Sequence, residues 1–277
     1  MHPAIPANSS FLKSFSLYLA FILATTHLAG CKNLELNSQW RDRDVVVDGV
    51  NSEWQNSTTY LEDEKVLIGV MNDENFLYIS LITDNPDLRR QMMGQGFIVW
   101  FDPSGGKKKV FGIQYPLGLQ EMGVPMMDFV GPDVDNEMRQ EIIEQSLMEL
   151  KILRSDEDDW DRMIVTDAIG IEVKVNDTGP FVYELRVPLR NSEHHPYAIG
   201  VKRESVGIGL EMQKFDRKKM MAGRGGGMRG GGMGRPGGMR GGMGVPPGGG
   251  MHRPEMAKPI KLWAKILLAP ETDLKQE

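Results

Sequence analysis

Short apolar runs separated by turn-forming residues dominate much of the chain after residue 44. Residues 65–71 are rich in aliphatic side chains and end at four turn-forming residues, 72–75. Residues 76–83 form the next apolar run, so the two runs together predict a β-hairpin. The same pattern predicts further strands at residues 45–47, 96–102, 110–115, 163–166, 169–175, 181–188, 197–201, 206–212 and 260–268.

Residues 181–187 show the alternation of a strand between a core and a wetter side. One face carries Phe181, Tyr183, Leu185 and Val187, and the other carries Glu184 and Arg186. A period of two with polar residues on one side predicts a strand covered by the core on one face only.

One segment has the period of an α-helix instead. Between residues 135 and 150 apolar side chains recur at spacings of three and four, and Asp135 is placed to cap the N-terminus. We therefore expect a single amphipathic helix lying against the end or side of a sheet. The acidic run 156–159 follows it, as a solvated loop or, alternatively, as a calcium site.

Many short strands with turn signals between them, and one helix, favour a mainly β fold, a sandwich or barrel, over an α/β fold. Residues 217–258 interrupt this pattern, because glycine, methionine, arginine and proline dominate them. Such a composition predicts a disordered insert. Since it lies between two predicted strands, we expect a hairpin with an expanded connection inside one domain, residues 44–270, followed by a tail, 271–277.

The N-terminus predicts export and lipid attachment. The apolar run 15–24 follows Lys13 and is too short for a membrane span, which takes about 20 residues. Leu28-Ala29-Gly30-Cys31 then resembles the lipobox of bacterial lipoproteins, with an ordinary secretory signal as the alternative. We expect a signal peptide over residues 1–30, lipidation at Cys31, a tether over residues 31–43 and an address in the bacterial cell envelope. Lys32 after the cysteine favours the outer membrane.

The composition limits the kinds of partner and cross-link that the protein can have. The net charge of −6 leaves no basic footprint for nucleic acid. Cys31 is the only cysteine, so no disulfide forms within the chain and stability must come from a core. After the signal no apolar run approaches membrane-spanning length, so the expected membrane contact is the N-terminal lipid.

Four stretches, in order, resemble the carbohydrate-binding module family 9-like domains. They are residues 46–54 with Asp-Gly and Glu-Trp, the hairpin 70–79 with its Leu-Tyr pair, the strand 97–103 ending in Asp-Pro, and residues 183–189 ending in Pro-Leu. The resemblance implies a two-sheet antiparallel β-sandwich of the kind also seen in DOMON-like domains, with residues 260–268 as the closing strand. It also implies carbohydrate binding through aromatic rings, and calcium as a possible family cofactor.

Three tryptophans are the candidate ligand contacts, because an indole offers a flat apolar face and a polar edge to a sugar. Trp160 follows the acidic run and is the best candidate for an exposed ring. Trp263 alternates with Lys261 and Lys265 and is the second. Trp100 has apolar neighbours, so a core role is favoured over binding.

Four aspartates stand at predicted strand ends, where oxygen ligands for calcium could converge. These are Asp48, Asp73, Asp84 and Asp102. Turn formation and capping explain the same residues without a metal, and that interpretation is preferred.

No catalytic signature such as Gly-x-Ser-x-Gly or His-Glu-x-x-His is found, so we expect a binding module rather than an enzyme, although an accessory role beside glycoside hydrolases fits the family. Carbohydrate is the favoured ligand. One alternative is an assembly lipoprotein that binds another envelope protein. Another is Cu(I) handling by the insert, whose soft ligands are Met220, Met221, Met228, Met233, Met239, Met243, Met251, Met256 and His252.

Overall fold

The computed structural model describes residues 34–124, 135–155, 160–213 and 258–271. The predicted signal peptide, Cys31, the acidic run 156–159, nearly all of the insert 217–258 and the tail after residue 271 lie outside the described residues. The chain divides into two units, Met1–Leu34 and Glu35–Glu277. Only Leu34 of the first unit is described, and the fold below is that of the second.

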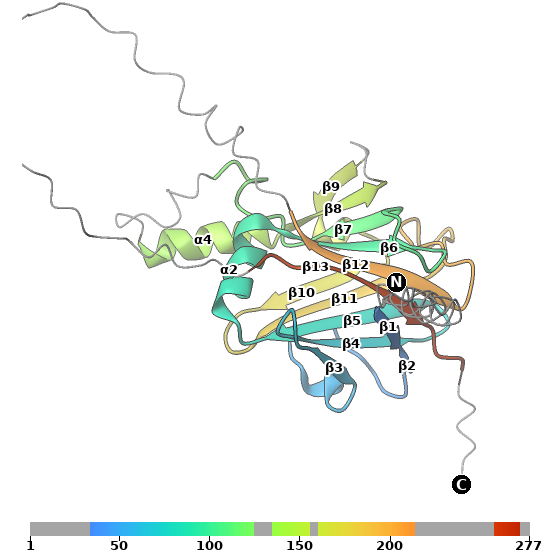
Figure 1. The fold of residues 1–277 in the computed structure, drawn as a ribbon. Coiled ribbons are helices and arrows are strands. Elements are labelled where there is room, and N and C mark those ends of the chain that lie inside the picture. The colour runs from blue at the N-terminus through green and yellow to red at the C-terminus, as the bar shows by residue number, and fades with distance from the viewer. Residues whose placement is uncertain (1–33, 125–134, 156–159, 214–257, 272–277) are drawn as a thin grey trace, which may run out of the picture. The chain divides into compact units, whose positions relative to one another are not determined.

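The strands of the described residues form two sheets (Figure 1). The larger has seven strands in the order β1 (Leu34–Asn37), β13 (Lys261–Leu267), β12 (Ser205–Met212), β6 (Phe97–Asp102), β7 (Phe111–Gln114), β8 (Glu149–Arg154) and β9 (Trp160–Ile164). The smaller has the order β10 (Glu172–Asn176), β11 (Phe181–Pro188), β5 (Phe76–Thr83), β4 (Val66–Asn72) and β2 (Gln39–Trp40), and β3 (Thr58–Leu61) also pairs with β4.

The core lies between the two sheets, as expected for a β-sandwich. Phe97 of β6 and Tyr183 of β11 are fully buried and meet edge to face, with ring centroids 5.2 Å apart. Around them lie the apolar faces of the central strands, including Phe101, Ile113 and Leu81. The protein is therefore mainly β with two packed layers, which confirms the predicted fold class.

The predicted hairpins are present. β4 and β5 pair antiparallel with Val70 opposite Ile79, and β12 pairs antiparallel with β13 with Ile208 opposite Ala264. The strands that flank the insert are thus neighbours in one sheet, as the sequence predicted. The sandwich is not wholly antiparallel, however, because β2 runs parallel to β4.

Two α-helices, not the one expected, occur in the described residues. The expected helix is α4 (Asn136–Ser146), and the Asp135 side chain accepts a hydrogen bond from the Met138 N–H at 2.7 Å. It ends four residues early because the chain continues into β8. The unexpected helix is α2 (Pro86–Gln95), whose N-terminus is capped by Asn85. It lies at the same end of the sheets as α4 (Figure 1). Neither helix is long and apolar enough to cross a membrane, and no other described helix is.

Other differences concern short segments. Residues 45–47 and 197–201 were expected to be strands, but neither forms one. β3 and β8 were not expected. β3 forms along β4 and β8 forms along β7. Val45 instead packs its side chain into a cluster and does not pair its backbone in a strand.

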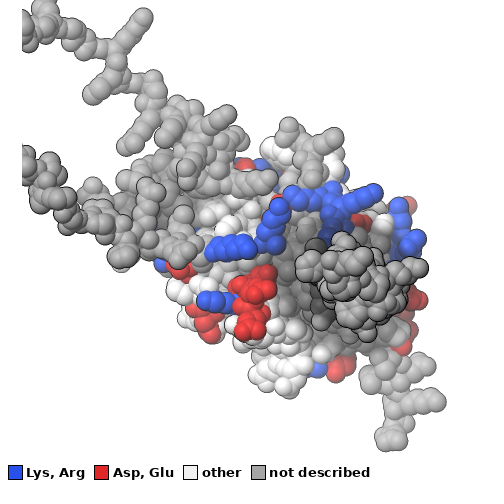
Figure 2. Space-filling view, viewed as in Figure 1, with Lys and Arg blue, Asp and Glu red and all other residues white. Residues whose placement is uncertain are grey.

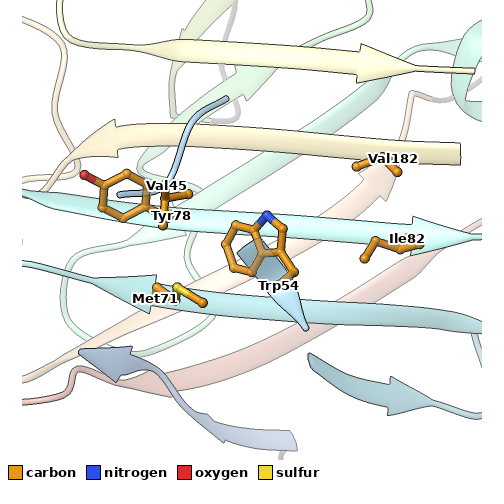
Figure 3. Packing of buried hydrophobic residues seen from close by; sticks show 6 residues of the cluster. All are labelled: Val45, Trp54, Met71, Tyr78, Ile82 and Val182. Atoms are coloured by element: carbon orange, nitrogen blue, oxygen red, sulfur yellow. The ribbon is translucent and has the colours of Figure 1, made fainter. Parts of the chain in front are cut away.

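Residues 45–57 cover the outer face of the smaller sheet. Trp54 ends the short 3₁₀ helix Ser52–Trp54 and packs in one cluster with Val45, Met71, Tyr78, Ile82 and Val182 (Figure 3). Val182 and Glu184, on the more polar face of β11, are only 4% and 1% exposed. β11 is therefore covered on both faces, and the prediction of a single covered face was wrong.

A buried carboxylate holds this covering segment on the sheet. Glu184 Oε1 accepts a hydrogen bond from Trp54 Nε1 at 2.6 Å, and Oε2 accepts from the backbone N–H groups of Gly49 at 2.7 Å and Asp48 at 3.1 Å. Burial raises the pKa of Glu184, and the hydrogen bonds from Gly49 and Trp54 oppose that rise.

The segment predicted to be a tether begins the fold instead. β1 belongs to the larger sheet and β2 to the smaller one, and Ser38 between them is 6% exposed. The Ser38 backbone N–H donates to the Leu267 carbonyl at 2.9 Å, and its hydroxyl donates to the Asn72 side chain. Asn72 Nδ2 in turn donates to the Ala269 carbonyl at 3.0 Å. Residues 34–40 therefore tie the ends of both sheets together.

Candidate functional site

The three candidate tryptophans lie in one cross-strand row on the larger sheet. Strand pairing sets Trp263 opposite Gly209, Gly209 opposite Trp100, Trp100 opposite Gly112, Gly112 opposite Leu153 and Leu153 opposite Trp160. Residues directly opposite in antiparallel strands project from the same face of the sheet. The tryptophan row, defined as these six residues, therefore lies on one face, across β13, β12, β6, β7, β8 and β9.

This face is the outer one. Along β12 the residues beside Gly209 in sequence, Ile208 and Leu210, project the opposite way and are 0% and 1% exposed in the core. Along β13, Ala264 and Ile266 likewise project into the core and are buried, so Trp263 projects from the outer face. The alternation of Trp263 with Lys261 and Lys265 thus predicted its face correctly.

Two glycines let indole rings lie flat on this face. A Cβ added at Gly209 would be 2.6 Å from Trp263 Cε2, and one at Gly112 would be 2.6 Å from Trp100 Cε3. Several ring atoms are almost equally close in each case, so the face of each indole covers the glycine of the neighbouring strand. Side chains larger than hydrogen at these positions would push the rings off the sheet.

The three rings differ in accessibility. Trp160 is 45% exposed, Trp263 is partly exposed and Trp100 is 4% exposed. Trp160 is the first residue of β9 rather than part of a loop. Trp100 lies beneath Lys109, whose Nζ is 5.1 Å from the indole centroid. The two ends of the row are thus open to a ligand, and its centre is covered by a charged side chain.

An acid–base pair accompanies each tryptophan. Glu211 Oε1 accepts from Trp100 Nε1 at 3.1 Å and from Lys109 Nζ at 2.8 Å. Lys151 Nζ lies 4.2 Å from the Trp160 centroid and 2.5 Å from Glu121 Oε2.

At the other end of the row, Lys265, two residues from Trp263 along β13, pairs with Glu35 of β1 at 3.1 Å. One ion pair therefore lies near each of the three rings.

Amide side chains extend the polar surface. Gln114 Nε2 donates to Gln213 Oε1 at 3.1 Å, and Gln213 Nε2 donates to Glu121 Oε1 at 2.5 Å. The network links the end of β7 to the Lys151–Glu121 pair beside Trp160. Figure 2 shows that on the side viewed in Figure 1 the basic side chains gather in a band largely separate from the acidic ones.

The calcium candidates lie at separate turns. Asp48 Oδ1 accepts from the Val50 N–H at 2.8 Å, and Asp73 Oδ1 from the Asn75 and Phe76 N–H groups at 2.8 Å. Asp102 accepts from the Ser104 N–H at 2.9 Å and the Lys108 N–H at 2.8 Å. Asp84 is exposed after β5. The described residues contain no group of three or more histidine, cysteine or acidic side chains that could hold a metal ion.

Two cavities lie outside the tryptophan row, and the first reaches the Glu149–Arg162 pair beside it. One, of about 690 Å³, lies beside β8 and β9 and is lined by apolar side chains such as Leu147, Met148 and Ile164. The other, of about 1270 Å³, lies at the turn between β4 and β5 and is lined by Trp40, Arg190 and other polar residues. Neither contains Trp100, Trp160 or Trp263.

Sequence reasoning found the aromatic residues of this face but missed their charged partners. Glu211 and Lys109 are 102 positions apart, and Lys151 and Glu121 are 30 apart. No local pattern marks such pairs, because only strand order and register bring them together.

The chain was compared with protein families, curated proteins and solved structures. No protein-family model matches the chain, and no curated protein does. Among solved structures, the chain is similar to a carbohydrate-binding module of family 9 from Caldicellulosiruptor kristjanssonii in complex with glucose. The match has 11% sequence identity and a TM-score of 0.36, and covers 67% of this chain and 81% of that one.

Proposed function

We propose that the protein is a lipid-anchored, non-catalytic carbohydrate-binding module and that its ligand lies on the outer face of the larger sheet. The observation that carries the proposal is the register that brings Trp263, Trp100 and Trp160 into one row. Flat indoles offer the apolar surface that the faces of sugar rings require, and nearby polar groups can hydrogen-bond the hydroxyls.

The three tryptophans have different roles in this proposal. Trp160 and Trp263 are accessible and supply the stacking surfaces. Trp100 is buried and donates to Glu211, so it positions this carboxylate instead of touching the ligand. Glu211 and Lys109 keep 16% and 24% of their side chains exposed, which leaves oxygen and nitrogen atoms available to sugar hydroxyls.

Replacing the accessible rings tests the function. We expect Trp160→Ala and Trp263→Ala each to weaken sugar binding about tenfold or more, as loss of an aromatic anchor commonly does. Binding is measured by glycan array and then by titration calorimetry on the purified protein. The matched control is Tyr60→Ala, because Tyr60 is 58% exposed on β3 of the other sheet.

Sugar binding that survives both tryptophan replacements would contradict this site, and no sugar binding at all would contradict the function. The rival, a lipoprotein that binds an envelope protein, has one observation in its favour. Met148, Ile164 and Ile169 are 59%, 53% and 58% exposed, and the first two line the cavity beside β8 and β9. Exposed apolar side chains of this kind are typical of protein contacts.

A further inference from the structure

The two accessible rings of the tryptophan row are too far apart to hold one sugar between them. Trp263 on β13 and Trp160 on β9 are separated by five strand spacings. At about 4.8 Å for each spacing, the two positions are about 24 Å apart across the sheet. A ligand that touches both rings must therefore be a chain of several sugar rings that runs across the strands.

The centre of the row suits the middle of such a chain. Between the two ends lie Gly209 and Gly112, which the Trp263 and Trp100 indoles cover, and the Lys109–Glu211 pair beside Trp100. Within the row, Leu153 is the one residue between this polar centre and Trp160. The face thus offers apolar ends and a hydrogen-bonding centre, instead of a closed slot for the end of a chain.

The charges of this face favour an uncharged chain. Five basic side chains lie on or beside the row, and four of them are paired with a carboxylate: Lys109 with Glu211, Lys151 with Glu121, Arg162 with Glu149, and Lys265 with Glu35. The fifth, Lys261, is exposed and stands opposite Glu211 in the neighbouring strand. An anionic polysaccharide would need unpaired cations, since its carboxylates would otherwise meet those of the protein. Five basic and four acidic side chains nearly balance along the row, so this face presents hydrogen-bonding atoms with little net charge.

Resting on the proposed carbohydrate function, we propose that the tryptophan row binds the interior of an extended, uncharged glycan chain lying perpendicular to the strands. Both accessible rings contact one ligand molecule, at sugar units several positions apart. Affinity then depends on the length of the chain, and its ends are not recognised.

The test uses the purified full chain and three series of β-1,4-linked oligosaccharides, of glucose, mannose and xylose, from one ring to six, with polygalacturonate as the anionic probe. For the series that binds, we expect affinity to rise about tenfold or more between two and six rings, the step that one aromatic contact supplies. Trp160→Ala and Trp263→Ala should each remove that rise and leave the weak affinity for short oligosaccharides within about threefold. Trp160→Phe should restore part of the rise, whereas Tyr60→Ala should leave it intact.

The outcomes separate this inference from the function on which it rests. Full affinity for a single sugar ring, or blocking of binding by reduction of the chain end, would overturn interior binding and leave sugar binding standing. Preference for polygalacturonate that weakens steeply with salt would overturn the uncharged ligand alone. Failure to bind any oligosaccharide or polysaccharide would overturn both proposals.

Discussion

Glycine within strands has one repeated use in this protein: it makes room for an indole. Trp54 lies on Gly69 of the smaller sheet, and Trp100 and Trp263 lie on Gly112 and Gly209 of the larger one. A glycine in a strand weakens it through backbone entropy and missing side-chain contacts. A ring from a neighbouring strand, or in the case of Trp54 from the covering 3₁₀ helix, restores the buried surface, as in the aromatic rescue of glycines in sheets.

Replacing one of these glycines should dislodge its ring. In Gly209→Ala the new Cβ would lie 2.6 Å from Trp263 Cε2, so the indole must lift away from β12. We expect the free energy of unfolding to fall by about 1–3 kcal/mol, as in other overpacked sites, with a shift in tryptophan fluorescence. Urea denaturation followed by fluorescence measures both.

The control for Gly209→Ala is Gly179→Ala. A Cβ at Gly179 meets nothing within 4 Å, so this change should alter stability by no more than about 0.5 kcal/mol. Equal effects of the two substitutions would mean that Trp263 does not lie on Gly209.

Glu184 should make stability depend on pH. Because burial raises its pKa above the ordinary 4.5, the folded protein binds this proton more tightly than the unfolded chain does. The stabilisation is therefore complete below pH 4.5 and is lost as the pH rises through the folded-state pKa. We expect the difference in unfolding free energy between the native protein and Glu184→Gln to shrink over that range, measured by urea denaturation at a series of pH values. A difference that grows with pH would show that the hydrogen bonds from Trp54 and Gly49 outweigh burial.

Single residues were predictable where a local pattern decides their environment. Trp263 alternates with lysines, and the structure places it on the outer face; Trp100 has apolar neighbours, and the structure buries it. Glu184 looked like a solvent-facing residue, because nothing nearby in the sequence shows that Trp54, 130 positions earlier, covers it. Contacts at that separation are decided by the fold as a whole.

At the scale of elements, the clearest consequence concerns the N-terminal strands. A chain that starts at residue 34 keeps β1, β2 and Ser38, whereas one that starts at residue 44 loses all three. The longer truncation removes the hydrogen bond from Ser38 to Asn72, which is 3% exposed, and leaves β13 at the edge of the sheet with β12 as its neighbour. A lost hydrogen bond costs about 0.5–1.5 kcal/mol, to which the lost strand pairing adds.

We therefore expect the chain from residue 34 to unfold at the same temperature as one from residue 32, and the chain from residue 44 to unfold well below both. Calorimetry of the three proteins measures this. Equal melting temperatures for all three would restore the interpretation of residues 31–43 as a tether. Ser38→Ala in the full chain removes only the hydroxyl. It should lower the melting temperature by less than the truncation to residue 44 does.

Elements with strong local signals were predicted, and those that depend on a neighbour were not. The hairpin of β4 and β5 has a long apolar pattern and a four-residue turn, and α4 has a capping aspartate. β3 is four residues long and β2 only two, and both depend on pairing with β4. The helix α2 was missed although Asn85 and Pro86 mark its start, because Leu88, Met92 and Met93 alone give it an apolar pattern.

At the scale of the whole molecule, the candidate site exists only in the assembled sheet. The tryptophan row draws its residues from six strands spread between residues 97 and 267. The sequence could supply the three tryptophans one at a time, but their alignment follows from the strand order β13-β12-β6-β7-β8-β9, which no local motif determines. The fold class was therefore within reach of sequence reasoning, and the geometry of the site was not.

The proposed lipid anchor is also tested on the whole molecule. Cys31 is the only thiol of the chain, so we expect radioactive palmitate to label the protein in growing bacteria and Cys31→Ala to abolish the label. The variant should fractionate as a protein released from the membrane, since one lost diacylglycerol removes the buried methylenes that each contribute about 0.8 kcal/mol. Cys31→Ser is the matched variant, because serine is close to cysteine in size but lacks the thiol, and it should lose the label as well. Labelling that persists without Cys31 would contradict the lipobox.

The early start of β1 limits how far the β-sandwich could stand from a bilayer if Cys31 carries a lipid. A lipidated Cys31 is three residues from Leu34, the first residue of the larger sheet. An extended chain covers at most about 3.6 Å for each residue, so the link could reach only about 11 Å. A module with so short a link to its lipid would lie against the lipid headgroups. It could capture only polymers that come down to the membrane itself, and glycans held farther out would pass beyond its reach.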